Sequence, residues 1–155
     1  RASARFGRVW YGSRSRHERL PMPALHAYFP TDPDRDQEWA FESVRSTLAG
    51  ADVTFDTKVN PFTRQANLKV AVDREYGQFH LTVSFEQGTA VDADLRTIAD
   101  GLGGAGFSRI RVLYGPDPDD DHTDVVVEVM DLFESFGPVL VYGADAERVF
   151  VDTLS

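Results

Sequence analysis

The fold is decided by residues 53–86, which read VTFDTKVNPFTRQANLKVAVDREYGQFHLTVSFE. Apolar and polar side chains alternate in three runs, and a short turn separates each run from the next. Alternation with a period of two is typical of a strand that has one buried face and one wet face. These residues therefore predict an antiparallel three-strand meander that buries Phe55, Leu68, Val70, Leu81 and Phe85.

The polar side chains of the same runs fall on the opposite face of the predicted meander, and they include both lysines of the chain. We expect no helix to cover this face, and its functional interpretation is a docking surface for a protein partner. A face of this kind is more often merely solvated. The predicted interaction face consists of Asp56, Lys58, Asn67, Lys69, His80, Thr82, Ser84 and Glu86.

Helical spacing of apolar residues flanks the meander on both sides. It predicts helices near residues 40–48, 91–102 and 125–136, with a strand at 125–130 as the alternative because three valines open that segment. Further strands are expected at 24–29, 109–114, 139–142 and 148–151. The order of these predicted strands and helices indicates one α+β domain over residues 1–155, which we expect to be a two-layer sandwich. Its antiparallel-rich sheet has the meander at its centre and about three helices packed on one face.

Composition excludes several classes of protein. The chain has 155 residues, of which 42% are hydrophobic and none is cysteine. This length and apolar content suit one domain with a sizeable core, while disulfides and thiolate metal sites are excluded. No window reaches the ~18 uninterrupted apolar residues of a membrane span, so we expect no membrane partner. The compartment stays undetermined, and a cytoplasmic location is compatible with these features.

The net charge of −9 divides into two unlike parts. Residues 1–21 carry six arginines against one acid, a charge of +5, and we interpret them as a basic N-terminal segment that forms an ordered strand or an extension. Residues 22–155 carry 24 acids against ten bases, a charge of −14, and form the acidic body. Such a body repels phosphate backbones and attracts basic partners, so we expect no nucleic acid on it.

These features favour a non-catalytic protein-binding module. The expected partner is another protein, and a basic surface on that protein would complement the acidic body. A second copy of the chain is the other expected partner. An inhibitor or immunity-type protein and a viral or phage structural subunit both have this charge character. We expect no cofactor and no metal, and no catalytic residue is assigned. A small-molecule binder with a pocket between helices and sheet is a further hypothesis, on which the sequence gives no residue.

The alternative is a divalent-metal-dependent hydrolase or nuclease-like enzyme, which would use carboxylates such as Asp56, Asp73 and Glu86. The segment 117–128 offers a second set, because its acids have the spacing of a calcium-binding loop. Those acids are Asp117, Asp119, Asp121 and Glu128. His122 stands where such a loop needs glycine, so we favour a simpler prediction. In it, Asp121 or Thr123 caps the third helix.

Overall fold

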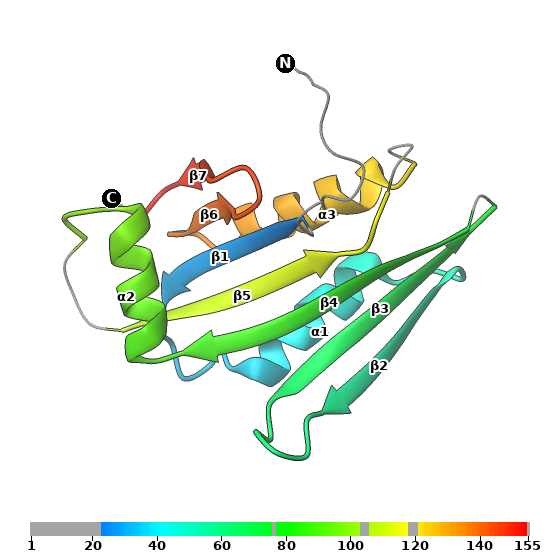
Figure 1. The fold of residues 1–155 in the computed structure, drawn as a ribbon, viewed down its shortest axis with the longest axis horizontal. Coiled ribbons are helices and arrows are strands. Elements are labelled where there is room, and N and C mark those ends of the chain that lie inside the picture. The colour runs from blue at the N-terminus through cyan, green and yellow to red at the C-terminus, as the bar shows by residue number, and fades with distance from the viewer. Residues whose placement is uncertain (1–22, 76, 103–105, 118–120, 155) are drawn as a thin grey trace, which may run out of the picture.

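A computed structural model describes residues 23–75, 77–102, 106–117 and 121–154 (Figure 1). The elements within them are β1 (Ala24–Pro30), α1 (Gln37–Leu48), β2 (Val53–Val59), β3 (Ala66–Arg74), β4 (Gly77–Gln87), α2 (Thr89–Ile98), β5 (Phe107–Tyr114), α3 (Thr123–Glu134), β6 (Leu140–Gly143) and β7 (Arg148–Asp152). The predicted α+β class is confirmed. The expected basic segment 1–21 lies outside the described residues. None of the described helices is long and apolar enough to cross a bilayer.

All seven strands form one antiparallel sheet in the order β2-β3-β4-β5-β1-β6-β7. Strands β2, β3 and β4 pair in succession, with Phe55 opposite Val70 and Val70 opposite Leu81. The expected central position of these strands is wrong, because they make up one end of the sheet. Strand β1 lies between β5 and β6 instead, and this long-range pairing adds four strands beyond β4.

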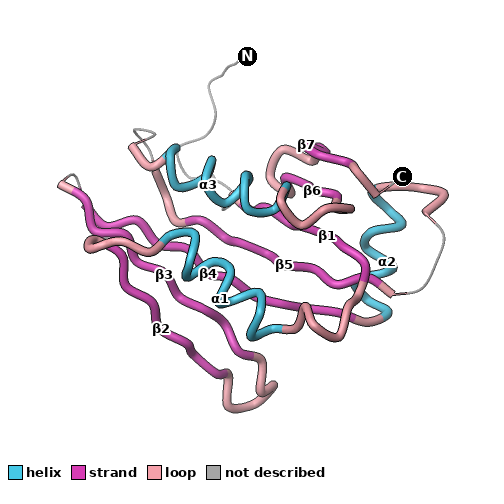
Figure 2. Tube along the Cα trace, turned by 180° about the vertical axis from the view of Figure 1, so that it is seen from behind, coloured by secondary structure: helices cyan, strands magenta, loops and turns pink. Residues whose placement is uncertain are grey.

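Helices α1 and α3 cover one face of the sheet (Figure 2). Phe41 on α1 and Phe133 on α3 are at most 2% exposed and join the apolar side chains of β3, β4 and β5 in one cluster. Burying a side chain of this size contributes about 1.5–3 kcal/mol. Residues 125–130 are helical, so the alternative strand does not form there. Spacing by four places Val125, Val129 and Phe133 on the buried side of α3.

The expectation that all helices pack on one face is wrong for helix α2. It lies on the other face of the sheet, across one end of β4, β5 and β1 (Figures 1 and 2). Successive residues of β1 explain this, because Phe29 joins the cluster under α1 and α3 whereas Tyr28 packs with Val91 and Leu95 of α2. The described part of the chain is therefore a two-layer sandwich with a third, partial layer. None of its helices covers the rest of the face on which α2 lies.

Candidate ligand-binding pocket

The predicted interaction face is the sheet face that α2 covers only at one end. Strand register places Asp56 opposite Lys69 and Lys69 opposite Thr82. Lys58 pairs with Asp56 at 3.0 Å, and Nζ of Lys69 donates to Oγ1 of Thr82 at 3.2 Å. Exposure varies across the set. Asp56, Lys58, Lys69 and His80 are exposed, Asn67, Thr82 and Glu86 are partly buried, and Ser84 is buried.

Glu86 belongs to an ionic cluster around the buried Arg109, which the sequence did not reveal. Arg109, only 6% exposed, donates to Glu86 at 2.9 Å, to Asp94 of α2 at 2.8 Å and to Oη of Tyr28 at 3.2 Å. Arg111 donates to the other oxygen of Glu86 at 3.1 Å. We call these five residues the Arg109 cluster. It joins α2 to the sheet, and it occupies both carboxylate oxygens of Glu86.

His26 lies beside the Arg109 cluster on β1. Burial, together with the positive charges of Arg109 and Arg111, lowers the pKa of His26 to about 4. This imidazole is therefore neutral near pH 7, and it lies with its ring centroid 6.3 Å from that of Tyr142.

The segment before α3 is organised by Asp117. Its carboxylate accepts hydrogen bonds from the backbone amides of Asp121 and His122, at 3.1 and 3.0 Å, and from Nδ1 of His122 at 2.9 Å. Burial alone would raise the pKa of Asp117, but these bonds lower it below its ordinary value. The expected cap by Asp121 or Thr123 is wrong, because His122 takes the N-cap position without a side-chain hydrogen bond.

Metal-ligating groups do not converge in the described part of the chain. No three of its His, Asp and Glu side chains are placed to hold an ion together. Residues 118–120, which include Asp119 of the predicted calcium-type spacing, lie outside the described residues. Asp117, the first acid of that predicted loop, already accepts hydrogen bonds from Asp121 and His122.

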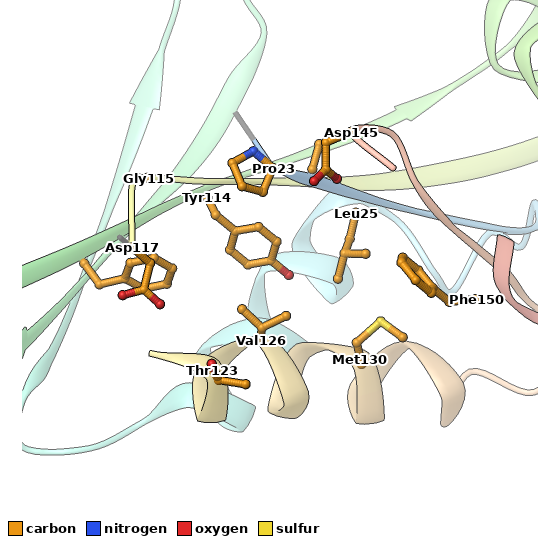
Figure 3. Close-up of a pocket in the computed structure, with 12 residues that line it drawn as sticks. Pro23, Leu25, Tyr114, Gly115, Asp117, Thr123, Val126, Met130, Asp145 and Phe150 are labelled. Carbon is orange, nitrogen blue, oxygen red and sulfur yellow. The ribbon is translucent and has the colours of Figure 1, made fainter. Parts of the chain in front are cut away.

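A pocket of about 440 Å³ opens between α3 and the sheet (Figure 3). We call it the Tyr114 pocket. Segments far apart in sequence enclose it: the start of β1, the end of β5, the first turns of α3 and the β6–β7 hairpin. Its lining consists of Pro23, Ala24, Leu25, Phe79, Tyr114, Gly115, Asp117, Thr123, Val126, Met130, Asp145 and Phe150. Gly143 leaves room for the Phe150 ring, since a Cβ there would collide with it.

Three nearly parallel rings stack beside the Tyr114 pocket, and two of them, Phe79 and Tyr114, belong to its lining. The His122 imidazole stacks on Phe79 with centroids 4.6 Å apart, and Phe79 stacks on Tyr114 at 6.1 Å. Figure 3 shows the Tyr114 side chain reaching from β5 toward Leu25 and Val126. Tyr114 is 4% exposed, and its Oη has no hydrogen-bond partner among the described residues. Nε2 of His122 is also buried without a partner there.

The pocket has a negative electrostatic character. Among the described lining residues, Asp117 and Asp145 are the charged ones, and none is Lys, Arg or His. Burial, and then the charge of Asp145, raise the pKa of the Tyr114 phenol. The phenol is therefore neutral near pH 7 and can both donate and accept a hydrogen bond.

Sequence reasoning placed Tyr114 on a strand but assigned it no function. No local signal marked it, because the pocket residues come from segments that are distant in sequence. Comparison with known proteins adds no assignment: no protein-family model matches the sequence, and neither a curated protein nor a solved structure matches the chain.

Proposed function

We propose that this protein is a non-catalytic binding domain that holds a small, largely apolar molecule in the Tyr114 pocket. The observation that carries the proposal is the buried hydroxyl of Tyr114, which has no hydrogen-bond partner within the described residues and lies beside a cavity of about 440 Å³. Ligand pockets commonly measure ~300–1,000 Å³ and combine apolar walls with a few polar anchors. Leu25, Val126 and Met130 supply the apolar wall, and Tyr114 supplies the anchor.

The energetics favour a bound partner for Tyr114. A buried hydroxyl without a hydrogen bond costs about 1–3 kcal/mol. A ligand hydroxyl or carbonyl that pairs with Oη recovers part of that cost. Because Oη is shielded in the free protein, the ligand must displace a neighbouring side chain to reach it, and Met130 is the most adaptable of those that line the pocket.

The alternative function, a metal-dependent hydrolase, has little support from the positions of its predicted carboxylates. Asp73 accepts from Gln78 at 2.6 Å, whereas Glu86 pairs with Arg109 and Arg111. Gln78 and Glu86 are eight residues apart on β4, which corresponds to ~26 Å along a strand. Asp56, on β2, pairs with Lys58. These groups therefore do not share one site.

A binding experiment with 2-(4-hydroxyphenyl)ethanol tests the proposal. This neutral probe carries a phenol that can pair with Tyr114 and a small apolar body. We expect its dissociation constant, measured by NMR titration of the full chain, to lie in the millimolar range with shifts at Val126 and Met130. Saturation at ten times that constant should add about 1.4 kcal/mol to the free energy of unfolding.

A matched pair of variants on α3 provides the control. Val126→Trp fills the Tyr114 pocket and should abolish probe binding. Val127→Trp makes the same change at a residue that is 50% exposed and absent from the lining, so it should bind the probe as the wild type does. If Val126→Trp folds and still binds the probe as tightly as Val127→Trp, the pocket is not the site.

A second candidate function is protein docking on the predicted interaction face. The observation in its favour is the partial cover by α2, which leaves exposed charges of both signs, Asp56 beside Lys58 and Lys69. If two copies paired through this face about a two-fold axis, lysines of one copy could meet Asp56 of the other. Acids elsewhere on the body would repel the second copy. A basic protein would instead meet α1 and α3, whose outer residues include Glu38, Glu42 and Glu128.

Sedimentation velocity tests self-association of the full chain. We expect a dimer at high protein concentration that Lys69→Glu dissociates, because the reversal places like charges against each other. Glu38→Lys, on the far side of the molecule, should leave the dimer intact. A wild-type monomer at every concentration would remove self-docking.

A further inference from the structure

We infer that the natural ligand of the Tyr114 pocket is an organic amine, with its protonated nitrogen at Asp145 and its apolar body inside the pocket. The inference rests on the proposed function and names the ligand class. Two features carry it, namely the charge of the lining and the availability of acceptor atoms at the rim.

The charge of the lining selects against anions. Its two charged residues, Asp117 and Asp145, are both acids, and no basic side chain compensates them among the lining residues that the structure describes. Water and salt weaken the attraction between an ammonium group and these two carboxylates, but the interaction stays attractive. The acidic body as a whole, with a charge of −14 over residues 22–155, adds to the same preference.

Asp145 is the acceptor that is available to a ligand. Asp117 already accepts hydrogen bonds from Asp121 and His122. Asp145 is exposed, in the turn between β6 and β7, and has no hydrogen bond or ion pair within the part of the chain that the structure describes. An ammonium group carries three donors and no acceptor, so a free carboxylate is its natural counterpart.

A nearby cation fixes the side on which the amine lies. The guanidinium of Arg148 stacks over the Phe150 ring at 5.2 Å and would repel a second cation there. Figure 3 shows Asp145 beside Pro23 and apart from the Phe150 ring. The ammonium group is therefore assigned to the Asp145 side of the rim. A hydrogen-bonding group at the far end of the ligand would meet Tyr114.

Three probes with one body and different head groups test the inference. They are tyramine with an ammonium group, 2-(4-hydroxyphenyl)ethanol with a hydroxyl, and 4-hydroxyphenylacetate with a carboxylate. Dissociation constants are measured by NMR titration of the full chain at low salt. We expect tyramine to bind about fivefold more tightly than the alcohol, as for an exposed ion pair, and the carboxylate to bind most weakly. Raising the salt to 0.5 M, roughly a tenfold increase, should reduce both differences.

Asp145→Asn should bring tyramine to the affinity of the alcohol and leave the alcohol unchanged. Glu147→Gln removes a neighbouring exposed carboxylate that does not line the pocket, so it should keep the tyramine preference. If none of the probes shifts the pocket residues, the proposed function itself fails. If the alcohol binds and tyramine binds no better, or if Asp145→Asn keeps the preference, only the amine assignment is overturned.

Discussion

Strands β1 and β5 each carry a buried tyrosine, and the two environments differ in one respect. Tyr28 faces α2, and its hydroxyl receives a hydrogen bond from Arg109. Tyr114 lies at the other end of the strand pair, under α3, and its hydroxyl has no partner among the described residues. A buried hydroxyl with a partner stabilises the fold, whereas a buried hydroxyl without one beside a cavity is a candidate place for a ligand. The comparison therefore separates a structural site from a candidate functional site.

Removing Arg109, the centre of its cluster, should have the largest effect. Arg109→Met leaves Glu86 and the Tyr28 hydroxyl without their common donor, and we expect a loss of about 3 kcal/mol in the free energy of unfolding. Urea denaturation measures it. Arg96→Met, on the exposed side of α2, should change that free energy by less than ~0.5 kcal/mol. A loss below 1 kcal/mol for Arg109→Met, on the order of an exposed ion pair, would contradict a structural role for the cluster.

Acid should weaken the same site through His26. Its pKa is about 4 in the folded protein and 6.5 ordinarily, so the unfolded chain binds the extra proton first. Stability from this group is therefore complete above pH 6.5 and falls as the pH drops toward 4. His26→Gln should lose correspondingly less stability over that window. Parallel pH profiles of the two proteins would disprove the assignment.

Conservative changes at the two tyrosines sharpen the comparison. Tyr28→Phe removes a hydrogen bond to a charged donor and should cost about 1.5 kcal/mol. Tyr114→Phe removes only an unpaired hydroxyl, so the free energy of unfolding should stay the same or rise by up to about 1 kcal/mol. Equal losses for the two variants in urea denaturation would show that Tyr114 has a partner after all.

The smallest effect is expected away from both sites. Lys58→Ala removes a pair with Asp56 in which both side chains are more than 60% exposed. Such pairs contribute little, so the free energy of unfolding should change by less than ~0.5 kcal/mol. A larger loss in the same urea titration would mean that the predicted interaction face has a structural role as well.

The fold was largely predictable because its signals are local. Alternation set the faces of β2, β3 and β4, and spacing by three and four set the helices. The side of the sheet that α2 covers was not predictable, since the stripe of Val91 and Leu95 fits either face. The choice depends on Tyr28 and Leu140, which are distant in sequence. The Tyr114 pocket was missed for the same reason, because β1, β5, α3 and the β6–β7 hairpin meet only in three dimensions.

The most direct test of the central claim is the affinity of 2-(4-hydroxyphenyl)ethanol for Tyr114→Phe. Stability of this variant should match or exceed that of the wild type, so a change in affinity reports the hydroxyl alone. We predict binding in the pocket that is about fivefold to tenfold weaker, the equivalent of one lost hydrogen bond of about 1–1.4 kcal/mol. An unchanged dissociation constant would show that the Tyr114 hydroxyl does not bind the ligand, and the proposed site would be wrong.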